Sequence, residues 1–219
     1  MILAVVPAYN EEANIHQVVK NLRQFVDKVV VVDDASTDKT FSEAQKAGAT
    51  VIRHKLNRGQ GAALETGHTY ARSVSADTVV HFDGDGQFDP AEIPQALAFL
   101  KKHKANVLLG SRFLEKKSNI PAFKKIVLLP LARLFDRVFT GLSLSDAHNG
   151  FRILDKKALH TMHLVQNRMA HASEIPQQIK QHSLKFVEFP VTVQYTRYGQ
   201  SAHGAIAIIK DTLTGLFIR

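Results

Sequence analysis

The chain has 219 residues, 45% of them hydrophobic, and its lysines and arginines outnumber its acidic residues by 28 to 20, a formal net charge of +8. This size and composition predict one domain with a sizeable core and exclude a disordered chain, and the absence of cysteine excludes disulfides and thiolate metal ligands. The positive charge favours anionic partners such as nucleotides, lipid headgroups or nucleic acid, without distinguishing among them.

The first half of the chain alternates apolar, β-branched runs with segments of helical period. This alternation is typical of a doubly wound α/β sheet. Between Ile15 and Val26, for example, apolar residues recur every three or four positions, as on the buried face of a helix. We expect strands at 2–6, 28–32, 50–54, 78–82 and 106–109, and helices at 11–26, 39–47, 60–73 and 90–102.

Beyond residue 113 the alternation stops. A basic amphipathic segment at 124–139, which Pro130 kinks or divides, predicts a helix that either lies on an anionic membrane surface or packs on the sheet with solvated lysines. The chain starts without the basic flank and long apolar core of a signal peptide, and no apolar run reaches the roughly 20 residues needed to span a bilayer. We further expect a helix at 172–182, a strand at 185–195, a polar turn at 197–203 and a short terminal helix.

Polar segments follow each of the five strands predicted in the first half. A parallel sheet binds ligands beyond the carboxyl ends of its strands, so we expect these segments to form the site. The most informative one is Asp83-Gly84-Asp85-Gly86-Gln87, whose two glycines allow two carboxylates and an amide to face the same side. Such oxygen ligands suit Mg²⁺ or Mn²⁺ held against the phosphates of a substrate. The same residues are also typical of an ordinary turn, and the segment alone does not decide between the two.

The ordered set of these segments resembles the family 2 glycosyltransferases of GT-A fold, and among them the dolichyl-phosphate and polyprenyl-phosphate sugar synthases. The resemblance covers nearly the whole chain and implies a single GT-A domain over 1–219, with a Rossmann-like doubly wound mixed sheet. Residues 1–113 would form the nucleotide-sugar-binding half, and 114–219 an elaboration that faces the acceptor and the membrane. The resemblance rests on Pro7-Ala8-Tyr9-Asn10-Glu11, on 31–40, on 57–64, on Asp83-Gly84-Asp85-Gly86-Gln87, on Gly110-Ser111-Arg112 and on Asn149-Gly150-Phe151-Arg152.

The resemblance also implies a donor site for a GDP- or UDP-linked sugar. Tyr9 would offer a flat face to the nucleoside, Glu11 would accept hydrogen bonds from the ribose hydroxyls, and Asp34 would accept them from the base. Asp38 is equally explained as a helix cap, and the Gly59-Gln60-Gly61 segment as a tight turn. The implied nucleotide-sugar residues are Pro7, Tyr9, Asn10, Glu11, Val32, Asp34, Asn57, Gly61, Phe82, Asp83 and Arg197, and the implied metal ligands are Asp83, Asp85 and Gln87.

The implied reaction is an inverting displacement at the sugar, in which Mg²⁺ or Mn²⁺ stabilises the departing nucleoside diphosphate. A phosphate acceptor is already anionic and needs no strong base, so Arg152 would hold the acceptor phosphate and Arg197 the donor diphosphate. A hydroxyl acceptor needs a carboxylate base, either Glu174 or Asp146, although Glu174 is also explained as a helix cap or as a partner of His171. The candidate catalytic residues are Asp85, Arg112, Arg152, Glu174 and Asp146, and the alternative for Arg112 is an ordinary surface arginine.

Two features depart from the family pattern. Ala202 and His203 stand where polyprenyl-phosphate synthases carry a lysine after a Gly-x-Ser turn, and the chain ends at Arg219, where many relatives continue into transmembrane helices. We therefore expect peripheral attachment at the cytoplasmic, inner face of the membrane, either directly or through a small membrane-protein partner, and a homo-oligomer is also compatible with the sequence. His148 and His171 lie beside the expected acceptor site, whereas His16, His68, His160 and His163 are expected at the surface or in helix packing.

The sequence thus predicts a metal-dependent, inverting transfer of a sugar to a polyprenyl phosphate lipid. The alternative is transfer to a hydroxyl of a lipid-linked or cell-surface glycan. A third hypothesis, a non-catalytic subunit that binds nucleotide or lipid, is less favoured because the acidic segment and Arg112 are both present. Nucleic acid is not an expected partner, since no recognition motif accompanies the charge, and a dinucleotide-dependent oxidoreductase is disfavoured because no glycine fingerprint follows the first strand.

Overall fold

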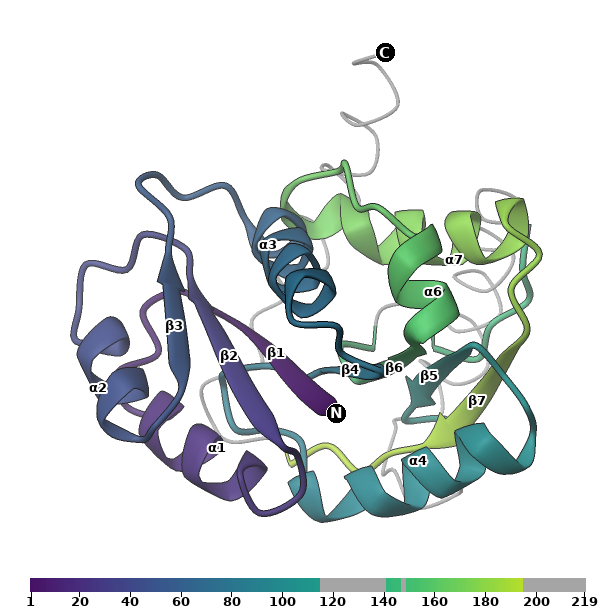
Figure 1. Ribbon diagram of the computed structural model, residues 1–219, viewed down its shortest axis with the longest axis horizontal. Helices are drawn as coiled ribbons and strands as arrows, with labels where there is room; N and C mark the ends of the chain where they lie inside the picture. Colours follow the sequence, from purple (N-terminus) through teal and green to yellow (C-terminus); the bar gives the residue numbers. More distant parts are fainter. Residues whose placement is uncertain (115–140, 147–148, 195–219) are drawn as a thin grey trace, which may run out of the picture.

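The computed structural model describes residues 1–114, 141–146 and 149–194. Within these ranges a seven-stranded sheet runs through the middle of the molecule and carries helices on both faces (Figure 1). The strands are β1 (Ile2–Ala8), β2 (Lys28–Asp33), β3 (Thr50–Arg53), β4 (Thr78–His81), β5 (Val107–Ser111), β6 (Arg152–Asp155) and β7 (Phe186–Pro190).

The sheet has the order β3-β2-β1-β4-β6-β5-β7. Neighbouring strands are parallel except at β6, which is antiparallel to both β4 and β5. At the centre, His81 of β4 is paired with Val5 of β1 on one side and with Arg152 of β6 on the other. The expected doubly wound, mixed sheet is therefore confirmed.

Two layers of helices cover the sheet. In β1, Ala4 and Val6 belong to the core on the side of α1, whereas Leu3 and Val5 belong to the core on the side of α3. Because both faces are buried, the central strands read as continuous apolar runs, which makes them recognisable in the sequence. One face carries α1 (Ile15–Leu22), α2 (Thr40–Lys46) and α4 (Ile93–Lys102), and a 3₁₀ turn (Pro90–Glu92) precedes α4 (Figure 1). The other face carries α3 (Gln60–Ser73), α6 (Lys156–Thr161) and α7 (His171–Gln181), and a 3₁₀ turn (Arg168–Ala170) precedes α7.

The elements expected in the first half are all present, with small differences at their ends. The helix expected at 11–26 is confined to α1, because its first residues form a turn in which the N–H groups of Asn14 and Ile15 donate to the carbonyl of Glu11 (3.0 and 2.9 Å). The strand expected at 185–195 ends at Pro190. Beyond it, Val193 forms only an isolated bridge with Phe88.

Sequence analysis predicted no element where β6 and α6 lie. β6 has only four residues and begins with a buried arginine, so it shows neither an apolar run nor an alternation. Since β6 and β7 complete the sheet, residues beyond 113 share the core of the first half. None of the helices within the described ranges is long and apolar enough to cross a membrane. The helix expected at 124–139, the turn at 197–203 and the terminal helix lie outside the described residues.

Candidate active site

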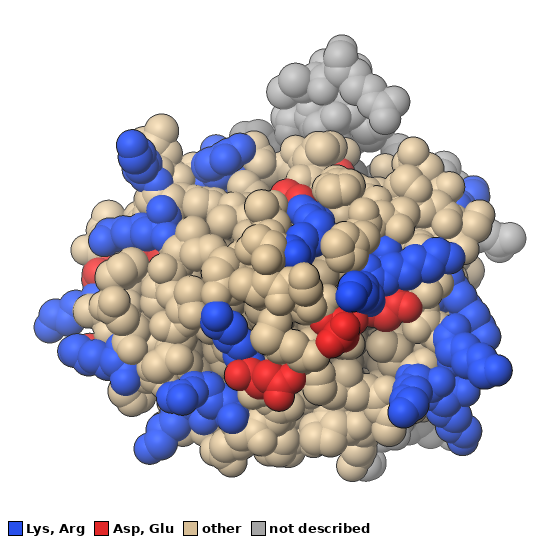
Figure 2. All heavy atoms as spheres, viewed as in Figure 1, with Lys and Arg blue, Asp and Glu red and all other residues tan. Residues whose placement is uncertain are grey.

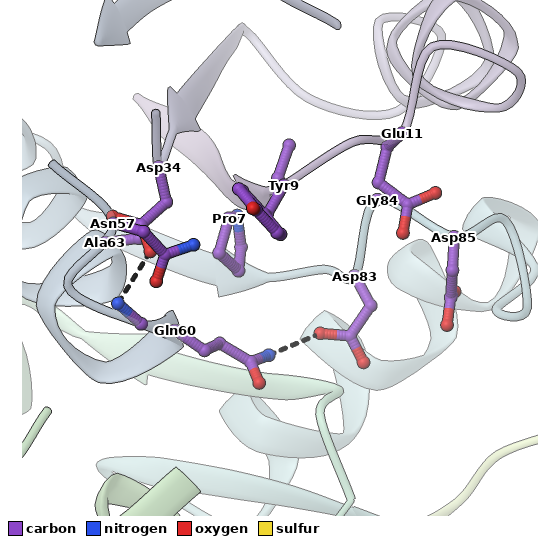
Figure 3. A pocket seen from close by; sticks show the side chains of 12 residues that line it. Pro7, Tyr9, Glu11, Asp34, Asn57, Gln60, Ala63, Asp83, Gly84 and Asp85 are labelled. Carbon is purple, nitrogen blue, oxygen red and sulfur yellow. Dashed lines mark hydrogen bonds between the residues drawn. The ribbon is translucent and has the colours of Figure 1, made fainter. Parts of the chain in front are cut away.

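A cleft of about 360 Å³ opens at the carboxyl ends of β1, β2 and β4. Figure 3 shows Asp34 and Asn57 toward one end of this cleft, Glu11 and Asp85 toward the other, and Asp83 between them. β1, the segments after β1, β2, β3 and β4, and the start of α3 supply the lining. The lining residues are Pro7, Ala8, Tyr9, Glu11, Asp34, Asn57, Gly59, Gln60, Ala63, Asp83, Gly84 and Asp85.

Asp34 fastens the loop between β3 and α3 to the end of β2. Its carboxylate accepts hydrogen bonds from the backbone N–H groups of Arg58 (2.9 Å) and Gly59 (2.6 Å). The Nδ1 atom of His54 lies 2.7 Å from the same carboxylate, and its Nε2 atom lies 2.9 Å from the hydroxyl of Thr66. Asp34 is only 3% exposed, so it is a fixed, buried acceptor at this end of the cleft.

The loops after β1 and β2 are joined by a second set of hydrogen bonds. The N–H of Asn10 donates to the hydroxyl of Ser36 (3.0 Å), and the side-chain oxygen of Asn10 accepts from the N–H of Thr37 (2.9 Å). Asp38 accepts from the backbone N–H of Thr40 at the start of α2 (2.9 Å). Asn10 therefore shapes the wall of the cleft without lining it, and the contact of Asp38 agrees with the capping interpretation.

Three carboxylates share the other end of the cleft. Burial and, to a smaller extent, the negative charge of Asp85 raise the pKa of Asp83 to about 6. Burial also raises the pKa of Asp85. The pKa of Glu11 is raised by burial and, to a smaller extent, by the charge of Asp85. The cleft thus concentrates negative charge at the point where a cation would neutralise it.

Two neighbours fix the carboxylate of Asp83. The side-chain amide of Gln60, the first residue of α3, donates to it at 2.9 Å (Figure 3). Gly150 packs directly against its other oxygen, because a Cβ at this position would lie only 2.1 Å from Asp83 Oδ2. Only glycine leaves room for the carboxylate here, which gives a physical reason for the glycine of the Asn149-Gly150-Phe151-Arg152 segment.

The donor chemistry of Asp83 and Asp85 fits a hard divalent cation. No group of three acidic or histidine side chains in the described ranges is arranged to hold a metal by itself. Mg²⁺ and Mn²⁺ are commonly held by one or two carboxylates together with phosphate oxygens of the substrate, so two acids suffice when a diphosphate completes the shell. The side chain of Gln87, the third expected ligand, does not line the cleft, and its backbone N–H donates to Asp85 Oδ1 (3.0 Å).

Arg152 provides a positive charge that is close enough to lower the pKa of Asp83. It lies in β6 rather than in the expected polar loop, and it is 3% exposed. Burial lowers its pKa to about 10, and the charges of Asp83 and Asp146 oppose that shift. Arg152 is therefore protonated near neutral pH and is held rigidly by the strand pairing with His81.

Arg112 and Asp146, which the sequence proposed separately, form one ion pair. The guanidinium donates twice to the carboxylate, from Nε to Oδ2 and from an Nη to Oδ1, both at 2.7 Å. The backbone N–H of Arg112 and the side-chain amide of Asn149 also donate to Asp146 (3.0 and 3.2 Å). Such a bidentate pair orients Arg112 and occupies the oxygens that a general base would need.

The comparisons with known proteins identify the family of this chain. Residues 3–162 match the description "Glycosyl transferase family 2". The chain belongs to this family.

Relatives of this glycosyltransferase include enzymes named for lipid phosphates. The UDP-N-acetylglucosamine–dolichyl-phosphate N-acetylglucosaminyltransferase of Methanococcus voltae is 30% identical over an alignment of 223 positions. The alignment covers 92% of this chain and 88% of the relative. The undecaprenyl-phosphate mannosyltransferase of Micrococcus luteus is 27% identical over an alignment of 235 positions. The alignment covers 100% of this chain and 95% of the relative.

A solved structure shows the same fold. The crystal structure of glucosyl-3-phosphoglycerate synthase from Mycobacterium tuberculosis, in complex with Mg²⁺ and UDP, matches with a TM-score of 0.75 at 20% sequence identity. The match covers 99% of this chain and 78% of that one. The GT-A fold expected from the sequence is thereby confirmed.

The structure brings most of the expected donor-site residues of this glycosyltransferase to one cleft. Val32 and Phe82 lie in the core behind it, and Gly61 packs against the carbonyl of Gln166. Sequence analysis missed the contact of Gln60 with Asp83, although the position of Gln60 at the start of a helix beyond β3 was a usable signal. Arg197 and His148 lie outside the described residues. The expected residues that line the cleft are Pro7, Tyr9, Glu11, Asp34, Asn57, Asp83 and Asp85.

Glu174 is placed differently from the expected acceptor-side acid. It is 4% exposed and does not line the cleft. Its two oxygens accept from the backbone N–H groups of Val165 (2.9 Å) and Gln166 (3.0 Å), and the amide of Gln178 donates to it as well (3.1 Å). The contacts give Glu174 a structural role that the sequence did not suggest, namely to hold the loop between α6 and α7.

His68 is a core residue and not a surface residue. It is fully buried, and its Nε2 atom lies 2.6 Å from Nε2 of His81 in β4. Burial lowers the pKa of both histidines. The pair links α3 to β4 next to the strand end that carries Asp83. Of the two places expected for His68, the surface and helix packing, the structure thus confirms helix packing.

Proposed function

We propose that this enzyme transfers a sugar from a nucleoside diphosphate sugar to the phosphate of a polyprenyl phosphate, by metal-dependent inversion, at the cytoplasmic face of a membrane. The observation that carries the proposal is the placement of Asp83 and Asp85 in one cleft beside the buried cation Arg152. The names of the relatives from Methanococcus voltae and Micrococcus luteus, which act on dolichyl and undecaprenyl phosphate, support the class of acceptor.

The residues of the cleft suit the two ends of the donor. Asp83 and Asp85 would hold Mg²⁺ or Mn²⁺ together with phosphate oxygens, and the bound ion would supply positive charge for the departing diphosphate. At the other end, the exposed ring of Tyr9 offers a flat face to a base. A carboxylate has about four acceptor positions, and three donors occupy the carboxylate of Asp34. The N–H of Arg58 is shared between both oxygens (2.9 and 3.2 Å), and an N–H of the base would share the carboxylate with it.

A phosphate acceptor suits this site better than a hydroxyl. A hydroxyl must lose its proton to a base as it attacks, whereas a phosphate oxygen is already anionic. The two carboxylates considered as bases, Asp146 and Glu174, are both occupied by donors. The oriented Arg112 fits the remaining task, which is to hold two anions close together, and the buried Arg152, which does not line the cleft, would add positive charge near Asp83.

The proposal is tested by incubating the protein with UDP- and GDP-linked hexoses, Mg²⁺ and a short-chain polyprenyl phosphate. We expect one donor to yield a lipid-phosphate sugar, and Asp85→Asn to lower its rate by about a hundredfold or more. The exposed Asp77→Asn, at the amino end of β4, is the matched control. No lipid product with any donor, or a sugar that appears only on a glycan hydroxyl, would overturn the proposal.

Thermal unfolding with UDP or GDP, each with and without Mn²⁺, tests the metal separately. We expect one nucleotide to stabilise the protein mainly when Mn²⁺ is present, and EDTA or Asp85→Asn to remove that stabilisation. Nucleotide binding that is independent of metal in both proteins would contradict the role proposed for Asp83 and Asp85.

A further inference from the structure

Two loops beside the cleft form one continuous surface. One is the β3–α3 loop at 54–59, and the other is the segment between α6 and α7 at 162–168. They touch where Gly59 meets the backbone of Arg168, and the start of α3 touches the second segment where Gly61 meets the carbonyl of Gln166, since a Cβ on either glycine would lie within 2.5 Å of those atoms. We call residues 54–59 and 162–168 the loop pair.

Buried acids hold both loops of the pair in place. Asp34 accepts from the N–H groups at positions 58 and 59, and Glu174 accepts from those at 165 and 166. The loop pair is therefore a preformed surface, and its exposed side chains are held out by a fixed backbone.

The loop pair exposes two large apolar side chains. Leu56 is 76% exposed and Val165 is 79% exposed, which are the highest values among the large hydrophobic residues that the structure describes. Between the loops and α3 runs an open groove that mixes apolar residues with polar ones, among them Thr66, Thr69 and Ser73. The protruding leucine and valine are thus the apolar part of this surface, and they are free to enter another apolar phase.

Basic side chains surround these apolar tips. Lys55, Arg58 and Arg168 are all exposed. Figure 2 shows Lys and Arg side chains, and no acidic ones, over the tip of the β3–α3 loop at its upper left. The acid in the groove, Glu65, is engaged by Arg72 and by the N–H of Leu164. The exposed charge of the loop pair is therefore positive.

We propose that the loop pair is the surface by which this enzyme docks on an anionic lipid bilayer, with Leu56 and Val165 inserted among the headgroups and the basic residues on lipid phosphates. Apolar side chains can insert into the interfacial region of a bilayer, and the lysine and arginine side chains beside them can bind its anionic phosphates. The location agrees, because Asn57 and Gly59 of the loop pair line the cleft. Docking here places the cleft beside a membrane surface that presents the phosphate of a polyprenyl phosphate, an advantage that rests on the proposed function.

Flotation of the full chain with vesicles tests docking without any reaction. The wild-type protein should float with phosphatidylglycerol-containing vesicles and far less with pure phosphatidylcholine. We expect Leu56→Ser/Val165→Ser and Lys55→Glu/Arg168→Glu each to lower the partition coefficient by about tenfold or more. Lys101→Glu/Lys104→Glu, which changes two exposed lysines at the end of α4, is the charge-matched control and should stay within about twofold of wild type.

Three outcomes would overturn the docking proposal: binding that the Leu56/Val165 variant leaves unchanged, an equal loss in the α4 control, or binding that requires a membrane protein in the vesicle. Because the substituted side chains are exposed, we expect the variants to fold, and circular dichroism checks this.

A transfer assay separates this proposal from the proposed function. With a short-chain, water-soluble polyprenyl phosphate, we expect Leu56→Ser/Val165→Ser to keep the wild-type rate. With a long-chain acceptor in anionic vesicles, the same variant should be slower by about tenfold. If the variant and the wild type have equal rates on the vesicle acceptor, the docking proposal is overturned and the proposed function is not. If the wild-type protein transfers sugar to neither acceptor, the proposed function is overturned, and the flotation result decides the docking proposal.

Discussion

His54 connects Asp34 to α3: its Nδ1 lies 2.7 Å from the carboxylate of Asp34, and its Nε2 lies 2.9 Å from the hydroxyl of Thr66. An ionised carboxylate only accepts hydrogen bonds, so Nδ1 of His54 donates to Asp34. The hydroxyl of Thr66, which also lies 3.0 Å from the carbonyl of Ala62, completes the contact at Nε2. His54 thus fixes the acceptor at the base end of the cleft while remaining outside the cleft itself.

Removal of this connection should weaken donor binding more than the chemical step. We expect His54→Ala to raise the KM for the nucleotide sugar by about tenfold with little change in kcat, because a charged hydrogen bond contributes about 1.5–3 kcal/mol and Asp34 keeps its two backbone donors. Steady-state kinetics and calorimetry with the free nucleotide measure this. Thr66→Val, which removes only the outer partner, should have a smaller effect, and an equal loss in kcat would show that His54 acts in the transition state.

The raised pKa of Asp83 makes the metal-free protein less stable at alkaline pH. In the unfolded chain this carboxyl has its ordinary pKa of 3.8, whereas in the folded protein its pKa is about 6. The contribution of this group to the free energy of unfolding is therefore fully present below about pH 4 and is lost as the pH rises through 6. Above that pH, we expect Asp83→Asn to increase the free energy of unfolding by about 1–3 kcal/mol relative to wild type, a gain that vanishes near pH 4.

Urea unfolding at several pH values, without divalent metal, measures this difference. Asp77→Asn is the control with the opposite sign, because pairing with the N-terminal amine lowers the pKa of Asp77. A destabilised Asp83→Asn protein at pH 8 would contradict the prediction.

The Arg112–Asp146 pair should act as a unit in catalysis. We expect Arg112→Lys to lower kcat/KM by about 10–100-fold, since lysine keeps the charge but loses the bidentate geometry. Asp146→Asn should give a loss of similar size, and the double variant should be little worse than either single one. Additive losses would show that the two residues act separately. A missing acidic limb in the pH–rate profile of Asp146→Asn would show that Asp146 is a base.

Glu174 should affect stability and not the pH dependence of the reaction. Because the buried carboxylate of Glu174 accepts from two backbone N–H groups and from Gln178, we expect Glu174→Gln to lower the free energy of unfolding by about 1–3 kcal/mol. The pH–rate profile of the remaining activity should keep its shape. Loss of the acidic limb of that profile, with an unchanged unfolding midpoint, would restore Glu174 as the general base.

The sequence by itself determined the parts of this protein that depend on local pattern. The sequence shows the apolar runs of β1, β2 and β4 and the helical period of α1 and α3. These patterns are visible because the buried residues of each element lie close together in the sequence. Since parallel strands share one edge for their carboxyl ends, the polar segments after them also predicted the cleft and most of its lining. The segments of the family resemblance identified the enzyme class on the same local basis.

Only the tertiary structure decided which charged groups meet. β6 is too short for a periodic signal, and its position between β4 and β5 follows from long-range strand pairing. That position puts Arg152 near Asp83, just as the folding of distant segments pairs Arg112 with Asp146 and turns Glu174 toward a backbone loop. A carboxylate acts as a ligand, a partner or a support according to the donors around it, and those donors come from residues that are far apart in the chain.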